Sequence, residues 1–180
     1  MGGGYLLSQS DSSTPETPRD DVTISSAGIY DAPAGINTNR DVEGDVLPAI
    51  DLSTTSGETV STSELVGTPL ILNVWSVTCE PCRKELPAFA SVSREFSGRV
   101  RVVGINAGDS ANAAEEFAEK YGLTYESLRD TDGEFMARLG VSGFPYTLFV
   151  DADGTIVAQK GIGLSAEAIR TTILESLLPS

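Results

Sequence analysis

The two cysteines of the chain, Cys79 and Cys82, are separated by two residues. Two thiols at this spacing can close a disulfide without a tertiary rearrangement, and the pair can then exchange electrons with a disulfide of another protein. A single C-x-x-C supplies only two of the four thiolates that a structural zinc ion needs. We therefore predict a redox-active dithiol, with two inert structural cysteines as the alternative.

A strand followed by a helix is predicted to position this pair. Residues 70–75 form a nearly continuous apolar run, which is typical of a strand buried on both faces. A helix is predicted from about Cys79 to Phe96, with Pro81 in its first turn, where no backbone N–H is needed. The partly positive helix N-terminus stabilises a thiolate, so Cys79 is the predicted nucleophile. Cys82, about one turn further along, is placed to resolve a mixed disulfide.

The remaining apolar pattern predicts an α/β fold with a mixed central sheet flanked by helices on both faces. Further strands are expected at residues 46–52, 58–61, 100–105, 146–150 and 155–158, and the first two of these form an extra N-terminal strand pair. Helical segments are expected at residues 63–65, 111–121, 133–139 and 165–178.

Residues 1–44 are predicted to be a flexible acidic tail or linker, and residues 45–180 the folded domain. Residues 8–21 are rich in Ser, Thr, Pro and Asp, and such a segment buries too little apolar surface to offset its ordering entropy. Ile29, Tyr30 and Ile36 are isolated apolar positions and are candidates for docking on the domain surface. Both a spacer behind a membrane anchor and an undirected terminus fit this composition.

Composition excludes several classes of function. A net charge of −14 argues against a nucleic-acid partner, because binding phosphates requires a basic surface. The absence of histidine removes Ser-His and Cys-His catalysis and the usual zinc sites, so we expect no cofactor and no metal. No apolar run reaches the roughly 18 residues of a membrane span, and the first residues lack the features of a signal peptide.

Two stretches together resemble a known family. The pattern W-x-x-x-C-x-P-C at residues 75–82, followed by R-K-E-L-P, is similar to the thioredoxin superfamily, and more narrowly to the TlpA/ResA-type extracytoplasmic thiol-disulfide oxidoreductases. Residues 141–151 carry the second element, which contains Phe144 and Pro145. The resemblance covers roughly residues 45–178 and implies a thioredoxin-like fold. It also implies a cis-proline at Pro145, packed beside the cysteines, and pairing of the Phe144 backbone with a substrate chain.

The resemblance assigns further roles near the dithiol. Cytosolic thioredoxins carry a buried aspartate six residues before the first cysteine, where this chain has Asn73. The family instead implies that Glu85, three residues after Cys82, tunes the protonation of the cysteines and relays protons. The predicted catalytic set is thus completed by Glu85 and Pro145. We assign Trp75, Glu80, Pro81 and Phe144 to substrate binding.

Charges around the cysteines affect the poise of the couple. Glu80 disfavours the thiolate, whereas Arg83 and Lys84 in the next turn favour it. A less stabilised thiolate makes a less oxidising couple, and the balance leans toward a reductant.

The predicted function is thiol-disulfide exchange that reduces disulfides of exported proteins. By resemblance, apocytochrome c with an oxidised haem-attachment C-x-x-C is a substrate, and a membrane thiol reductant supplies the electrons. The resemblance also implies a place on the extracytoplasmic side of a bacterial cell membrane, with an anchor that precedes Met1. We expect a monomer. A disulfide-forming oxidase, a thiol peroxidase and a non-enzymatic peptide-binding module remain the alternatives.

Overall fold

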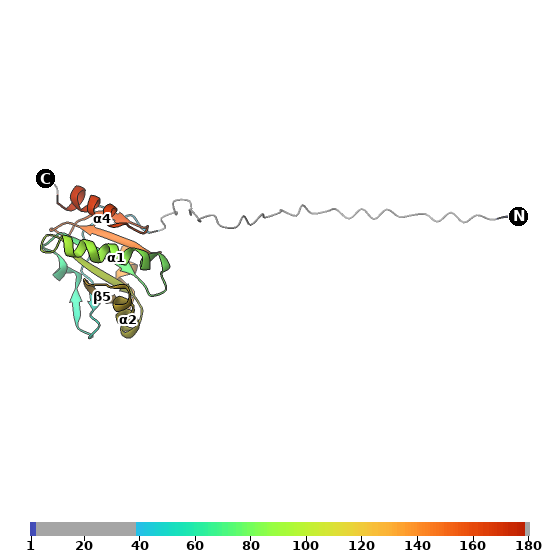
Figure 1. Cartoon of the computed structure of the whole chain (residues 1–180), viewed down its shortest axis with the longest axis horizontal. Coiled ribbons are helices and arrows are strands. Elements are labelled where there is room, and N and C mark those ends of the chain that lie inside the picture. Colours follow the sequence, from blue (N-terminus) through green and yellow to red (C-terminus); the bar gives the residue numbers. More distant parts are fainter. Residues whose placement is uncertain (3–38, 179–180) are drawn as a thin grey trace. The chain divides into compact units, whose positions relative to one another are not determined.

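A seven-stranded mixed sheet forms the centre of this computed structural model, which describes residues 1–2 and 39–178 (Figure 1). The strand order is β2-β1-β5-β4-β3-β6-β7, with β3 parallel to β4 and antiparallel to β6. The strands are β1 (Asp51–Ser53), β2 (Thr59–Ser61), β3 (Leu70–Trp75), β4 (Arg101–Ala107), β5 (Glu126–Asp130), β6 (Tyr146–Val150) and β7 (Ile156–Lys160). The predicted fold class, including the extra N-terminal strand pair, is confirmed.

Helices cover both faces of the sheet. They are α1 (Glu80–Glu95), α2 (Ala111–Tyr121), α3 (Glu134–Leu139) and α4 (Ala166–Thr172), with a 3₁₀ turn η1 (Thr62–Leu65) and a π-helical segment η2 (Ile173–Leu177). Figure 1 shows α1 lying between α4 and α2. These three helices pack on one face, whereas α3 and η1 pack on the other through Phe135, Leu139 and Leu65.

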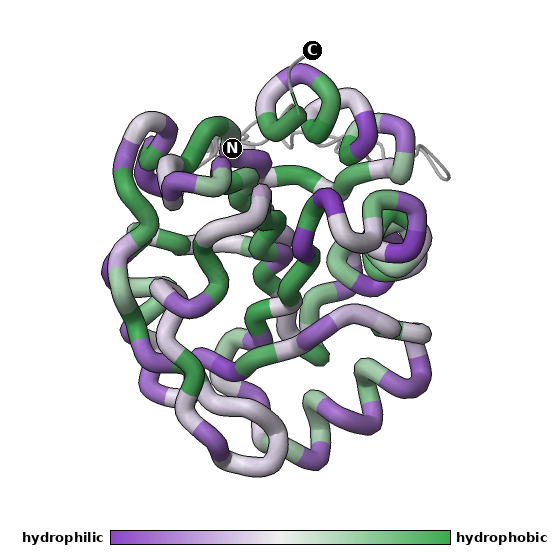
Figure 2. The backbone as a smooth tube through the Cα atoms, turned by 90° about the vertical axis from the view of Figure 1, so that its left-hand side faces the viewer, coloured by the Kyte–Doolittle hydropathy of each residue, from purple (hydrophilic) through white to green (hydrophobic). Residues whose placement is uncertain are grey.

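Strand β3 is central and fully buried, because its side chains face helices on both sides of the sheet. Ile71 packs with Phe89 of α1 and Ile169 of α4, whereas Leu72 on the opposite face packs with Phe135 of α3. The central strands are accordingly hydrophobic stretches, and the peripheral helices alternate between hydrophilic and hydrophobic residues (Figure 2). The strand predicted at residues 70–75 is confirmed, and its end fixes where the dithiol begins.

Two strand predictions need correction. The strand expected at residues 46–52 is reduced to β1, and Val46 makes only an isolated bridge with Thr155. Pro48 lies between them and has no N–H to contribute to a ladder. Strand β5 was not predicted, because Leu128 is its only large apolar residue. Its pairing with β4 places it in the sheet nonetheless.

The folded part begins before the boundary that we expected at residue 45. Val42 is completely buried in the core, and the Gly44 N–H donates to the Ile156 carbonyl at 2.8 Å. Residues 39–44 therefore pack on the domain. The rest of the predicted tail, including Ile29, Tyr30 and Ile36, lies outside the described residues. None of the helices in the described ranges is long and apolar enough to cross a bilayer.

Candidate active site

Cys79 and Cys82 are joined by a disulfide at the start of α1. Cys79 is the N-cap residue, with extended backbone, and its sulfur accepts a hydrogen bond from the Cys82 N–H at 3.2 Å. The exposed fraction is 9% for Cys79 and 0% for Cys82. Cys79 is therefore the sulfur nearer to solvent, and the Cys82 N–H in the first helical turn points at it.

The turn between β3 and α1 is held by a side chain from the distant turn after β4 and by one from α1 itself. The Val77 N–H donates to the Asp109 carboxylate at 2.9 Å, and the Asn106 amide donates to the same oxygen at 2.8 Å. The Arg83 guanidinium donates to the Val77 carbonyl at 2.8 Å. These bonds fix the turn that presents Cys79. We did not predict Asp109, because nothing in its local sequence signals a contact made 32 residues away.

Trp75 lies beneath the dithiol and not on the surface. Its side chain is completely buried and stacks on Phe117 of α2, with ring centroids 5.1 Å apart. The indole N–H has no hydrogen-bond partner among the described residues. The substrate-binding role that we expected for Trp75 does not fit this burial, because a buried ring cannot contact an incoming chain. Its place in one apolar cluster with Cys79 and Cys82 indicates packing support for the site.

Glu85 is buried two helical positions before Pro87, with an exposed fraction of only 2%. One carboxylate oxygen accepts a hydrogen bond from the Asn73 amide at 2.8 Å, and the other accepts from the Leu164 N–H at 3.1 Å. Burial raises the pKa of Glu85 from 4.5 to about 7, and these two hydrogen bonds act in the opposite direction. At neutral pH the carboxyl therefore populates both protonation states.

A buried tyrosine extends the contacts of Glu85. The Tyr125 hydroxyl donates to the side-chain amide oxygen of Asn73 (Oδ1) at 3.3 Å, which leaves the side-chain nitrogen of Asn73 directed at Glu85. Burial raises the pKa of Tyr125 far above its ordinary value, and the nearby Glu85 carboxylate raises it further. Tyr125 therefore stays protonated and acts as a hydrogen-bond donor. Neither Tyr125 nor Leu164 carried a signal in the sequence.

A pocket of about 350 Å³ lies beside the dithiol turn. Its walls contain residues of α1 and of the loop before α4: Pro81, Lys84, Glu85, Gly163, Leu164 and Ser165. The pocket thus brings Glu85 and Pro81, one of the two residues between the cysteines, to one concave surface. Pro81 is exposed, as a residue that contacts substrate must be.

Two of the charged residues near the dithiol, Glu80 and Arg83, form an ion pair at the surface. Glu80 is exposed and forms an ion pair with Arg83 at 2.8 Å. The Arg83 guanidinium also lies 5.9 Å from the ring centre of Phe117. Because Arg83 neutralises Glu80 locally, the effect of Glu80 on the cysteines is smaller than its position between them suggests.

Phe144 and Pro145 are joined by a cis peptide bond, so the isomer that the resemblance implied is confirmed. Phe144 is half-buried and packs against the apolar cluster that contains both cysteines, while Pro145 is buried. The sequence-distant loop and the dithiol turn are therefore neighbours in space.

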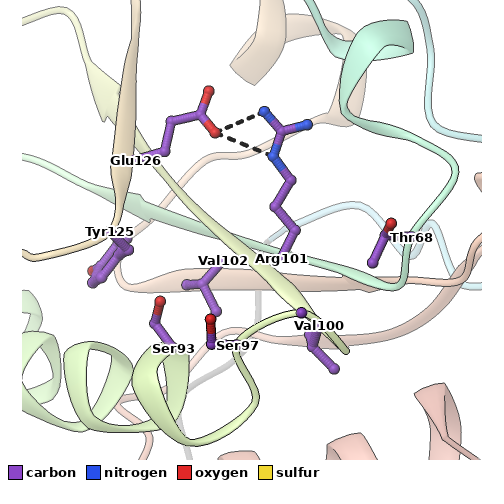
Figure 3. A pocket seen from close by; sticks show the side chains of 9 residues that line it. Thr68, Ser93, Ser97, Val100, Arg101, Val102, Tyr125 and Glu126 are labelled. Atoms are coloured by element: carbon purple, nitrogen blue, oxygen red, sulfur yellow. Dashed lines mark hydrogen bonds and ion pairs between the residues drawn. The ribbon is translucent and has the colours of Figure 1, made fainter.

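Another pocket, of about 360 Å³, is lined by hydroxyl-bearing side chains and by the Arg101–Glu126 ion pair (Figure 3). Arg101 pairs with Leu70 at the start of β3, whereas Cys79 follows the end of that strand. This pocket therefore lies at the opposite end of the sheet from the dithiol. Within the described ranges, no three acidic, cysteine or histidine residues are grouped as metal ligands.

A dithiol that caps a helix, a cis-proline loop beside it and a mixed sheet of this order define the thioredoxin-like class. The solved structures agree. A secreted disulfide oxidoreductase from Mycobacterium tuberculosis, described as homologous to Escherichia coli DsbE, has a TM-score of 0.64 and 28% identity, covering 69% of this chain and 94% of that one. StoA from Bacillus subtilis has a TM-score of 0.61 and 28% identity, covering 70% and 96%.

Residues 44–159 match the AhpC/TSA family, and the chain belongs to it. The chain is 34% identical to the thiol-disulfide oxidoreductase ResA of Bacillus subtilis over 64% of this chain and 65% of that protein, slightly less than two thirds of its length. It is 33% identical to the thiol:disulfide interchange protein DsbE of Pseudomonas fluorescens, over 79% and 78%. These relatives confirm the predicted enzyme class, thiol-disulfide oxidoreductase.

Proposed function

We propose that the protein reduces disulfides of other proteins through Cys79 and Cys82. The observation that carries this proposal is the asymmetry of the pair, in which Cys79 caps α1 near solvent and Cys82 is fully buried beside it. A helix N-terminus favours the thiolate of the accessible sulfur. The buried sulfur is reached only by its neighbour, which suits a resolving role.

The reaction balances within the two cysteines and the substrate. The Cys79 thiolate attacks one sulfur of the substrate disulfide and displaces the other as a thiolate. Cys82 then attacks the Cys79 sulfur, closes the Cys79–Cys82 disulfide and releases the second substrate thiol. The substrate gains two electrons and two protons, and the dithiol loses the same two electrons and two protons as it closes to the disulfide.

Glu85 is proposed to move the protons in these steps. A carboxyl with a pKa of about 7 accepts and donates protons readily at neutral pH. Its contact with the pocket that contains Pro81 supports exchange between solvent and the dithiol turn. The geometry of Phe144 supports a backbone contact with substrate beside Cys79, as the family resemblance implies.

The substrate class that we propose is an exported protein with a closed C-x-x-C disulfide, such as apocytochrome c, with a membrane thiol reductant as the electron donor. The resemblance to TlpA/ResA-type proteins supports this assignment. A similar solved structure is that of a secreted protein, which supports the extracytoplasmic side of a bacterial cell membrane as the location. A monomer is part of the same proposal.

The test is a reduction assay combined with a redox titration. Wild type and Cys79→Ser are compared for reduction of a disulfide-closed peptide that contains C-x-x-C-H. Both proteins are first reduced and freed of reductant, and we expect one equivalent of peptide disulfide to be reduced per wild-type protein and none per Cys79→Ser protein. Equilibration in graded thiol buffers then gives the potential of the Cys79–Cys82 couple. A value below about −230 mV supports a reductase, whereas a value near −120 mV means that the protein forms disulfides.

A further inference from the structure

The loop before the cis-proline, residues 142–144, is hydrogen-bonded by the side chain of Asn39, which is distant in the sequence. The side-chain amide oxygen of Asn39 (Oδ1) accepts hydrogen bonds from the Ser142 N–H at 2.7 Å, the Gly143 N–H at 3.0 Å and the Ser142 hydroxyl at 3.3 Å. The Asn39 amide donates to the Gly143 carbonyl at 3.4 Å. Asn39 thus bonds two successive backbone N–H groups that lie 103 and 104 residues away in the sequence.

Asn39 is itself anchored by the segment that follows it. The Arg40 N–H donates to the Gly140 carbonyl at 3.0 Å. A side chain on Gly140 would bring its Cβ within 2.6 Å of the Arg40 Cβ, so the two segments are tightly apposed. Val42, three residues on, is completely buried, and its N–H donates to the Gln159 side chain at 3.0 Å. The position of Asn39 is therefore set by the core.

Within the described part of the chain, the backbone N–H and carbonyl of Phe144, which follows Gly143, are free to hydrogen-bond with a ligand. Across residues 39–178, the Phe144 N–H and carbonyl make no hydrogen bond, and Pro145 has no N–H. Phe144 packs against the cluster that contains Cys79 and Cys82. An extended polypeptide that enters beside Cys79 would find these open backbone groups, and main-chain pairing of this kind supplies affinity.

We propose that Asn39 is a positioning residue that preorganises the Ser142–Phe144 backbone to receive an extended segment of the substrate polypeptide. The proposal rests on the proposed function of the dithiol. By accepting hydrogen bonds from the Ser142 and Gly143 N–H groups, Asn39 fixes the direction in which the Phe144 N–H and carbonyl point. Because the loop is already ordered in the free protein, substrate binding does not have to supply the entropy cost of ordering it. A disulfide without a polypeptide chain does not use this surface.

The test compares two substrates across four proteins: wild type, Asn39→Ala, Asn39→Asp and Arg40→Ala. The disulfide-closed C-x-x-C-H peptide reports on chain binding, and the small disulfide DTNB reports on dithiol chemistry alone. Asn39→Asp keeps the oxygen that accepts from the two N–H groups. Arg40→Ala is the matched control, because it removes an exposed ion pair with Asp45 but keeps the backbone contact to Gly140.

Each protein is pre-reduced and followed through a single turnover. For Asn39→Ala we expect the half-saturating peptide concentration (KM) to rise about tenfold, with the limiting rate (kcat) changed by less than about twofold and the DTNB rate unchanged. Asn39→Asp and Arg40→Ala should stay within about twofold of wild type on both substrates. If Asn39→Ala is too unstable to assay, Asn39→Ser replaces it with the same expected rise, because its shorter side chain cannot span both N–H groups.

Three results would overturn the role of Asn39: an unchanged peptide KM, an equal loss on both substrates, or a loss in Asn39→Asp as large as in Asn39→Ala. The second would mean that the substitution disturbs the dithiol itself. Failure of the proposed function is distinguishable, because wild type would then reduce DTNB but not the peptide, or neither.

Discussion

The buried carboxyl of Glu85 makes folding stability depend on pH in a defined direction. Its pKa is about 7 in the folded protein, against 4.5 as the ordinary value that an unfolded chain approaches. Between these two values the unfolded chain has released the proton while the folded protein still holds it. The folded state binds more protons in this range. The contribution of Glu85 to the free energy of unfolding is therefore fully present below pH 4.5 and is lost as the pH rises through about 7.

The size of this effect follows from the same two values. Each pKa unit corresponds to about 1.4 kcal/mol, so the difference gives a loss of ~3 kcal/mol between pH 4 and pH 8. Glu85→Gln removes the titration. The glutamine side chain keeps one oxygen that accepts from Asn73 or Leu164, and its NH2 group faces the other donor, as the hydroxyl of a protonated carboxyl does. The substitution therefore lowers the free energy of unfolding by an amount that does not depend on pH.

Urea unfolding of the oxidised protein measures the effect, because the disulfide removes cysteine titration. We expect the free energy of unfolding of wild type, relative to Glu85→Gln, to fall by ~3 kcal/mol from pH 4 to pH 8. The exposed helix glutamate Glu115 provides the matched control, and Glu115→Gln should keep the wild-type pH dependence. Parallel curves for wild type and Glu85→Gln would refute the assignment of a raised pKa to Glu85.

Two further predictions concern the dithiol and its support. Removing a negative charge from the dithiol region favours the Cys79 thiolate, so Glu85→Gln should move the midpoint of Cys79 alkylation to lower pH. Glu80→Ala should cause a smaller shift in the same direction, because Glu80 already forms an ion pair with Arg83. Unchanged profiles would show that these carboxylates are bystanders. Gly104→Ala should destabilise the protein by about 1–3 kcal/mol in thermal or urea unfolding, because the added Cβ would lie 2.8 Å from the Trp75 indole nitrogen.

Gly163, in the loop before α4, provides the matched control for Gly104→Ala. A Cβ at Gly163 would meet no atom within 4 Å, and its φ lies outside the left-handed range. Gly163→Ala should therefore leave stability within about 0.5 kcal/mol of wild type. Equal effects of the two substitutions would contradict the close approach of Trp75 to β4.

The local parts of the site were predictable from sequence, because short-range patterns determine them. The buried run at residues 70–75 marked β3, and the spacing of Cys79 and Cys82 after it placed the pair at a helix N-terminus. The cis bond at Pro145 came from family resemblance and not from local pattern, since most X-Pro bonds are trans.

The parts that sequence did not reveal depend on long-range contacts. Leu164 contributes only a backbone N–H to Glu85, across 79 residues, and a backbone donor leaves no signature in residue type. Asn39 lay in a segment whose composition predicted a tail, but the buried side chain of Val42 ties this part of it to the core.

The central claim is that Cys79 attacks the substrate and Cys82 resolves the mixed disulfide. The most direct measurement is trapping with the disulfide-closed C-x-x-C-H peptide, followed by mass spectrometry of the intact protein. Reduced Cys82→Ser should accumulate a covalent adduct of one peptide through Cys79, released by dithiothreitol, whereas Cys79→Ser should form little or none. A stable adduct on Cys82 in the Cys79→Ser protein, at the rate seen for Cys82→Ser, would contradict the account.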